Sequence, residues 1–170
     1  MLKSMPHTSF ERLNVGDEIP PVVRGPMTCA HIMRWSSAIE NWHRIHYDRD
    51  YAVDHDGLPD ILVNGSWKQH LLMEMLTAFA GDTGWLWKIA FQYRKTDARG
   101  AVLTAWGRIT DKAELDGLGR VGLEIGIRNQ DGDESTPGTA MVVLPLTDAG
   151  PVACPFLAGD QVETQSRSPK

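Results

Sequence analysis

Hydrophobic residues recur at helical spacing soon after the start of the chain. Ile32, Trp35, Ile39 and Trp42 fall on one face of a helix that would begin after Thr28, a residue type that caps helix N-termini. The sequence therefore predicts a first helix that ends in the polar stretch following Trp42.

Residues 66–80 have the pattern of a longer, half-buried amphipathic helix. One half of the helical wheel is apolar: Trp67, Leu71, Leu72, Met75, Leu76, Ala78 and Phe79. The other half carries Gln69, His70, Met73, Glu74 and Thr77. Ser66 is expected to cap the start of this helix, and Gly81 has the place of a helix-ending glycine.

After this helix the hydrophobic period changes from the helical value to two. Strand-like runs cover residues 85–94, 101–110, 120–129 and 139–146, and they are separated by glycine-containing turns. Helices followed by an antiparallel meander indicate an α+β fold rather than alternating βαβ units. A long apolar helix followed by four strands predicts an antiparallel sheet wrapped around that helix, which is the hotdog architecture.

Size and composition fit one domain. The chain has 170 residues, 42% of them hydrophobic, and a net charge of −5. We expect a single domain over residues 10–147, with extended or poorly ordered ends at 1–9 and 148–170. The acidic balance argues against a general nucleic-acid binder, and no apolar run is long enough for a membrane span or a signal peptide. Cys29 and Cys154 form no disulfide framework. A cytoplasmic protein is expected.

The densest group of polar side chains lies in residues 40–48, at the end of the first predicted helix. His43 and His46 stand three residues apart beside an amide, a guanidinium, a phenol and two carboxylates. A histidine is the side chain most easily poised for proton transfer near neutral pH. The alternative is structural, because a helix end followed by a loop gathers such residues to cap carbonyls and form turns. A metal site is weakly indicated, since no further ligands stand at a recognisable spacing.

Residues 41–52 resemble the N-x-H-R-I-H-Y-D-x-x-Y-A motif of MaoC-like hydratases and dehydratases. They are most similar to the branch of hydroxyacyl-thioester dehydratases and mesaconyl-CoA hydratase. Residues 62–65 resemble the segment that opens the central helix in that family, and the resemblance extends over about residues 10–146. It implies reversible syn hydration of a trans-2-enoyl thioester of coenzyme A or acyl carrier protein. No metal and no cofactor besides the coenzyme A of the substrate are implied.

The resemblance also assigns roles to individual residues. His46 matches the catalytic histidine, and Gly65 matches the residue whose backbone N–H faces the thioester oxygen; a turn glycine is the alternative for Gly65. Asn41 stands where the common motif has a catalytic aspartate, five residues before His46; it cannot act as a carboxylate base but could orient a water in the catalytic site. The second catalytic group is therefore open, with His43 as first candidate and Asp48 as second, although Asp48 could equally cap the following turn.

Other residues are candidates for binding substrate. Asn64, which replaces a histidine common in the family, and Ser66 are expected among the substrate-binding residues. Lys68 and Arg94 could meet the phosphates of coenzyme A, or they could be solvated charges.

The resemblance further implies that the domain pairs with another hotdog unit, as a homodimer or with a separately encoded subunit. Two other functions remain open. A hotdog thioesterase would need a carboxylate on the central helix, where Glu74 is the only one. A non-catalytic subunit of a heteromeric hydratase would account for the missing aspartate at Asn41.

Overall fold

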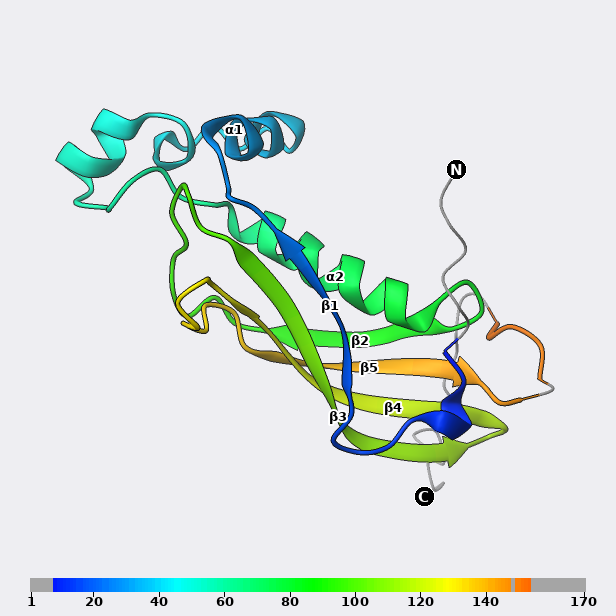
Figure 1. The fold of residues 1–170 in the computed structure, drawn as a ribbon. Helices are drawn as coiled ribbons and strands as arrows, with labels where there is room; N and C mark the ends of the chain where they lie inside the picture. The colour runs from blue at the N-terminus through cyan, green and yellow to red at the C-terminus, as the bar shows by residue number, and fades with distance from the viewer. Residues whose placement is uncertain (1–7, 148, 154–170) are drawn as a thin grey trace, which may run out of the picture.

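The computed structural model describes residues 8–147 and 149–153. Its five strands pair antiparallel in one sheet, in the order β1-β3-β4-β5-β2, and the sheet curls around helix α2 (Figure 1). The strands are β1 (Glu18–Arg24), β2 (Trp85–Phe91), β3 (Leu103–Leu115), β4 (Leu118–Arg128) and β5 (Gly138–Pro145). The helices are α1 (Cys29–Ala38) and α2 (Gly65–Ala80), with short helical turns η1 (Phe10–Arg12), η2 (Arg44–His46) and η3 (Tyr51–His55). The predicted α+β hotdog architecture is confirmed.

Helix α2 supplies the centre of the core. The predicted apolar face is buried at Leu71, Leu72, Met75, Leu76 and Phe79, and the helix packs against all five strands. Each such side chain contributes about 1.5–3 kcal/mol by leaving water. The helix ends at Gly81 as predicted, where a φ of 67° suits a residue without a side chain. Its start differs from the prediction, because Asn64 and not Ser66 is the N-cap residue.

Strand β1 was not predicted from the sequence. It contains Pro20 and Pro21, which cannot donate hydrogen bonds to a neighbouring strand. The strand tolerates them because it lies at an edge of the sheet, paired only with β3, and its register shifts between Ile19 and Val22.

Helix α1 is shorter than predicted, since it ends at Ala38. Glu40 adopts a φ of 53°, and the N–H groups of Glu40 and Asn41 donate to the carbonyls of Ser37 and Ser36. These two bonds close the helix as a Schellman motif. The prediction that Ile39 and Trp42 lie on the apolar face of the helix is wrong, and they are 42% and 58% exposed.

Closing α1 early redirects the chain toward the start of α2. The turns η2 and η3, cyan in Figure 1, lie with α1 at the N-terminal end of α2. Most of the motif recognised in residues 41–52 is therefore held beside the helix terminus that the sequence analysis singled out.

The described parts of both chain ends rest on the domain. The Thr8 hydroxyl donates to the Phe79 carbonyl, and the Val152 N–H donates to the Thr83 carbonyl. The expectation for residues 1–7 and 154–170, including Cys154, falls outside the described residues. None of the described helices is long and apolar enough to cross a membrane.

Candidate active site

His46 is held in one tautomer by the backbone. The residue ends η2, is 8% exposed, and its Nδ1 lies 2.9 Å from the carbonyl oxygen of Leu62. A carbonyl can only accept a hydrogen bond, so Nδ1 carries the proton and the neutral ring has its lone pair on Nε2. An imidazole oriented in this way is prepared to accept a proton at Nε2.

Burial keeps this ring neutral. Loss of water around His46 lowers its pKa below the ordinary value of 6.5, and the neighbouring His43 acts in the same direction, while the bond to Leu62 partly opposes them. At neutral pH His46 is therefore a base rather than a cation.

The same segment is tied to the start of α2. The Leu62 N–H donates to the Ile45 carbonyl at 2.9 Å, so that η2 runs beside the residues that lead into the helix. His46 thus bonds to a residue only three positions before Gly65.

The first turn of α2 has no side-chain cap. Asn64 occupies the N-cap position but makes no capping bond, because its buried amide exchanges hydrogen bonds with the hydroxyl of Ser36 on α1 at 3.1 and 3.2 Å. The first N–H groups of a helix have no partners within the helix, and its dipole favours negative charge there. The helix start beside His46 is therefore suited to an oxygen that carries developing negative charge.

Tyr93 lies over Gly65, a contact that the sequence did not predict. A Cβ at Gly65 would approach Cζ and Cε2 of Tyr93 to 3.0 and 3.1 Å. The ring is 50% exposed, and burial of the remainder raises its pKa. The contact joins residues 28 positions apart, which no local spacing could reveal.

The other motif residues hold the loop. The Asn41 Oδ1 accepts the N–H of His43, and the Nδ1 of His43 accepts the N–H of Ile45. His43 is exposed, and its ring centroid lies 6.3 Å from that of His46. Because Nδ1 accepts, the neutral His43 ring carries its proton on Nε2.

Asp48 has the capping role that the sequence left open. Its carboxylate accepts the N–H of Tyr51 at 3.0 Å and pairs with Arg44 at 2.6 Å. Those two interactions, the backbone bond first, lower its pKa. Its oxygens are committed to the loop, which weakens its candidacy as the second catalytic group.

The structure is compatible with two of the predicted substrate-binding residues, Ser66 and Arg94, and contradicts a third, Lys68. Ser66 lies in the first turn of α2, where its hydroxyl accepts the indole N–H of Trp35, and Arg94 is exposed beyond β2. Lys68 is a correction: its ammonium group is buried and donates to Asp97, to the Lys95 carbonyl and to Ser135. A lysine enclosed in this way does not reach the phosphates of coenzyme A.

Within residues 8–147 and 149–153, no three histidine, cysteine or carboxylate side chains gather as metal ligands would. His43 and His46 are thus joined by no third candidate ligand in that part of the chain.

Comparison with known proteins points in the same direction as the motif. Residues 17–100 match the family model described as hydroxyacyl-thioester dehydratase type 2. Mesaconyl-C(4)-CoA hydratase of Chloroflexus aurantiacus is 46% identical over 44 residues, which are 26% of this chain and only 16% of that protein.

Solved structures share the fold. A chain of the ChsH1–ChsH2 complex from Mycobacterium tuberculosis superposes with a TM-score of 0.65 at 24% identity, over 77% of this chain and 98% of that one. The MaoC-like dehydratase of Rhodospirillum rubrum has a TM-score of 0.69 at 17% identity, over 82% of this chain and 97% of that one. The motif, the family model and the fold together support a relationship of the chain to the MaoC-like hotdog family of hydratases and dehydratases.

Proposed function

We propose that the chain adds water reversibly across the C2–C3 double bond of a trans-2-enoyl thioester carried by coenzyme A or acyl carrier protein. The thioester oxygen would bind the N–H groups at the first turn of α2. His46 would take a proton from water as the water oxygen bonds to C3, and this proton would then pass to C2 on the same face. The product is the 3-hydroxyacyl thioester, and dehydration is the reverse.

One arrangement carries this proposal. A neutral histidine with its lone pair on Nε2 is bonded, through Leu62, to the segment that opens an uncapped helix. A base and an electrophilic helix terminus held at one place are the two elements that conjugate addition of water requires.

The second polar group is proposed to be His43. Asn41 cannot act as a base and serves the loop instead, while the oxygens of Asp48 are already bonded. The exposed His43 is the remaining group near His46 that can position a water or relay a proton. His43→Gln should lose about as much activity as His46→Ala, and the double variant little more, because groups acting on one step are non-additive.

A matched variant decides between the two candidates. Asp48→Asn should lower kcat less than His43→Gln does, because it only loosens the loop. The two kcat values are compared under conditions in which both variants are fully folded. If Asp48→Asn proves as damaging as His46→Ala while His43→Gln is mild, the assignment to His43 is wrong.

A catalytically silent subunit is the second candidate, because Asn41 replaces the carboxylate of the common motif and a structural relative comes from a two-protein complex. In either case we propose that a second hotdog unit, from another copy or a separate subunit, completes the site. A thioesterase is less well supported, because Glu74 is ion-paired with Arg24.

Hydration assays test these functions together. The full chain is incubated with crotonyl-CoA and with a longer enoyl-CoA, and both enoyl absorbance and free thiol are followed. Loss of enoyl absorbance without thiol release supports the hydratase, and thiol release alone identifies a thioesterase. Neither signal, with thioester binding retained, identifies a binding subunit.

A further inference from the structure

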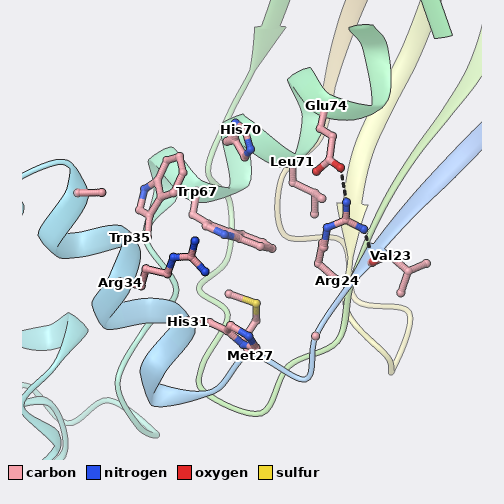
Figure 2. Close-up of a pocket in the computed structure, with 12 residues that line it drawn as sticks. Val23, Arg24, Met27, His31, Arg34, Trp35, Trp67, His70, Leu71 and Glu74 are labelled. Atoms are coloured by element: carbon pink, nitrogen blue, oxygen red, sulfur yellow. Dashed lines mark hydrogen bonds and ion pairs between the residues drawn. The ribbon is translucent and has the colours of Figure 1, made fainter. Parts of the chain in front are cut away.

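A cleft of about 620 Å³ lies between α1, the end of β1 and the side of α2 that carries Trp67, Leu71 and Glu74 (Figure 2). None of the residues assigned above to the proton-transfer step lines it. Its position beside the first half of α2 makes it a candidate binding site of its own.

The walls of the cleft are apolar and largely aromatic. Met27 and Leu71 are buried at its sides, and the indoles of Trp35 and Trp67 are half-buried. Flat apolar walls of this kind favour an elongated hydrocarbon body over a small polar ligand.

The rim of the cleft is cationic, although the whole chain is acidic. Arg24 forms an ion pair with Glu74, the one carboxylate among the lining residues, so these two charges offset each other. Arg34 forms no ion pair with any described residue, and Figure 2 shows its side chain extending from α1 toward Trp67. The guanidinium of Arg34 is therefore the uncompensated charge of the cleft.

Two histidines add hydrogen-bonding capacity without negative charge. The Nδ1 of His31 accepts the N–H of Thr28, so the neutral ring keeps a donor on Nε2. His70 packs against Trp35 with ring centroids 5.2 Å apart. His31 and Arg34 thus both present hydrogen-bond donors that an anion could use.

The cleft lies next to the proposed thioester site, because two of its lining residues, Trp35 and Trp67, contact or adjoin Ser66 in the first turn of α2. The indole N–H of Trp35 donates to the Ser66 hydroxyl at 2.9 Å, and Trp67 follows directly on α2. From Gly65 to Leu71 the helix rises about 9 Å, a length that an extended eight-carbon acyl chain covers.

We propose that this cleft receives the distal part of an acyl group whose far end carries a carboxylate, with Arg34 as the residue that selects the charge. The inference rests on the proposed thioester chemistry and assigns its substrate class. A guanidinium binds a carboxylate through charge-assisted hydrogen bonds, whereas a methyl end would leave it unpaired.

The test compares two eight-carbon trans-2-enoyl-CoA substrates that differ only in ending with a methyl group or a carboxylate. Because the coenzyme A part is common to both, the ratio of their kcat/KM values isolates the far end of the acyl group. We expect the full chain to favour the carboxylate about two- to fivefold, a modest factor because Arg34 is exposed. Arg34→Gln should abolish this preference, and Arg34→Lys should keep part of it. Arg12→Gln, an exposed arginine of η1 away from the cleft, is the matched control and should leave the ratio unchanged.

A binding arm separates this inference from the proposed function. Calorimetry with the saturated thioesters octanedioyl-CoA and octanoyl-CoA needs no turnover. If neither enoyl substrate is hydrated but octanedioyl-CoA binds more tightly, and Arg34→Gln removes the difference, the hydratase proposal fails and the charge-selective cleft stands. The inference is overturned if the two substrates have equal kcat/KM values, or if Arg34→Gln leaves their ratio unchanged. If there is no turnover, equal binding of the two saturated thioesters overturns it.

Discussion

Replacing Lys68 with methionine should destabilise the whole domain rather than weaken substrate binding alone. The Lys68 ammonium lies 3.0 Å from an Asp97 oxygen and 2.9 Å from the Lys95 carbonyl, and the side chains of Lys68 and Asp97 are 3% and 2% exposed. Methionine fills a similar volume but leaves the Asp97 carboxylate buried without its partner. Breaking a buried pair in this way costs about 3–5 kcal/mol.

Urea unfolding followed by tryptophan fluorescence measures this cost directly. In a thermal scan the same change should lower Tm by about 6–20 °C, since a chain of this size loses about 2–4 °C per kcal/mol. The matched control is Lys95→Met. It breaks the Lys95–Asp133 pair, whose side chains are both 58% exposed, and should cost no more than about 1 kcal/mol. Lys68→Met combined with Asp97→Leu should recover much of the loss, because the orphaned charge is gone.

The Lys68 result also bears on the site. Lys68 holds the carbonyl of Lys95, two residues beyond the Tyr93 ring that lies over Gly65. The argument from burial would be refuted if Lys68→Met unfolded at the same urea concentration as the unaltered chain and showed a raised KM for the thioester. The original expectation of phosphate binding by Lys68 would then be right.

Three further changes test the proposed chemistry. His46→Ala should lower kcat about 10²- to 10⁴-fold with little change in thioester binding, and near-normal turnover would remove His46 from the mechanism. In the unaltered chain the acid limb of kcat/KM against pH should lie below 6.5, because burial holds the pKa of His46 under that value. His46 binds a proton more readily in the unfolded chain than in the folded one. Its contribution to the free energy of unfolding is therefore present above pH 6.5 and is lost as the pH falls, which urea titrations at several pH values can check. Gly65→Ala should change the free energy of unfolding by no more than about 1 kcal/mol, because the better helix propensity of alanine offsets its close contact with the half-exposed Tyr93. The added methyl group should nevertheless obstruct the helix start and lower kcat/KM in steady-state assays. An unchanged kcat/KM would mean that the thioester binds elsewhere. Ser36→Ala should free the Asn64 amide to cap α2 and so lower kcat with a small change in Tm; a large fall in Tm without loss of activity would contradict this.

The parts of the fold with regular periodicity could be predicted from the sequence. The buried face of α2 and the four strands after it follow from periods of 3.6 and two, which local sequence expresses directly. Strand β1 could not be found in this way, because Pro20 and Pro21 are unfavourable in strands, and only its edge position makes them acceptable. The end of α1 was equally hidden, since the apolar spacing continues to Trp42 while Glu40 takes a conformation rare for its residue type.

The candidate site could be predicted only as far as local motifs reach. Resemblance to a family motif suggested His46 and Gly65 as candidates, but the bond from His46 to the Leu62 carbonyl, which fixes the tautomer, depends on tertiary structure. Lys68 was misread for a related reason. A charged residue in a first helical turn is usually solvated, and the helical wheel carries no information about the segment of Lys95 and Asp97 that covers it.

The unused cap of α2 connects these observations. An asparagine at an N-cap position ordinarily stabilises its helix by about 1 kcal/mol through a bond to a free N–H group. Here Ser36 on α1 binds the buried Asn64 amide, so Asn64 does not form the capping bond to α2, the helix at the centre of the core. The same helix α1 reaches Ser66 through Trp35 and places Arg34 at the cleft, and its early end lets the chain return with His46. One short helix thereby keeps the α2 terminus open, forms a wall of the proposed acyl cleft beside it and lets the chain return with the proposed base, so the groups of the proposed reaction gather around a single turn of helix.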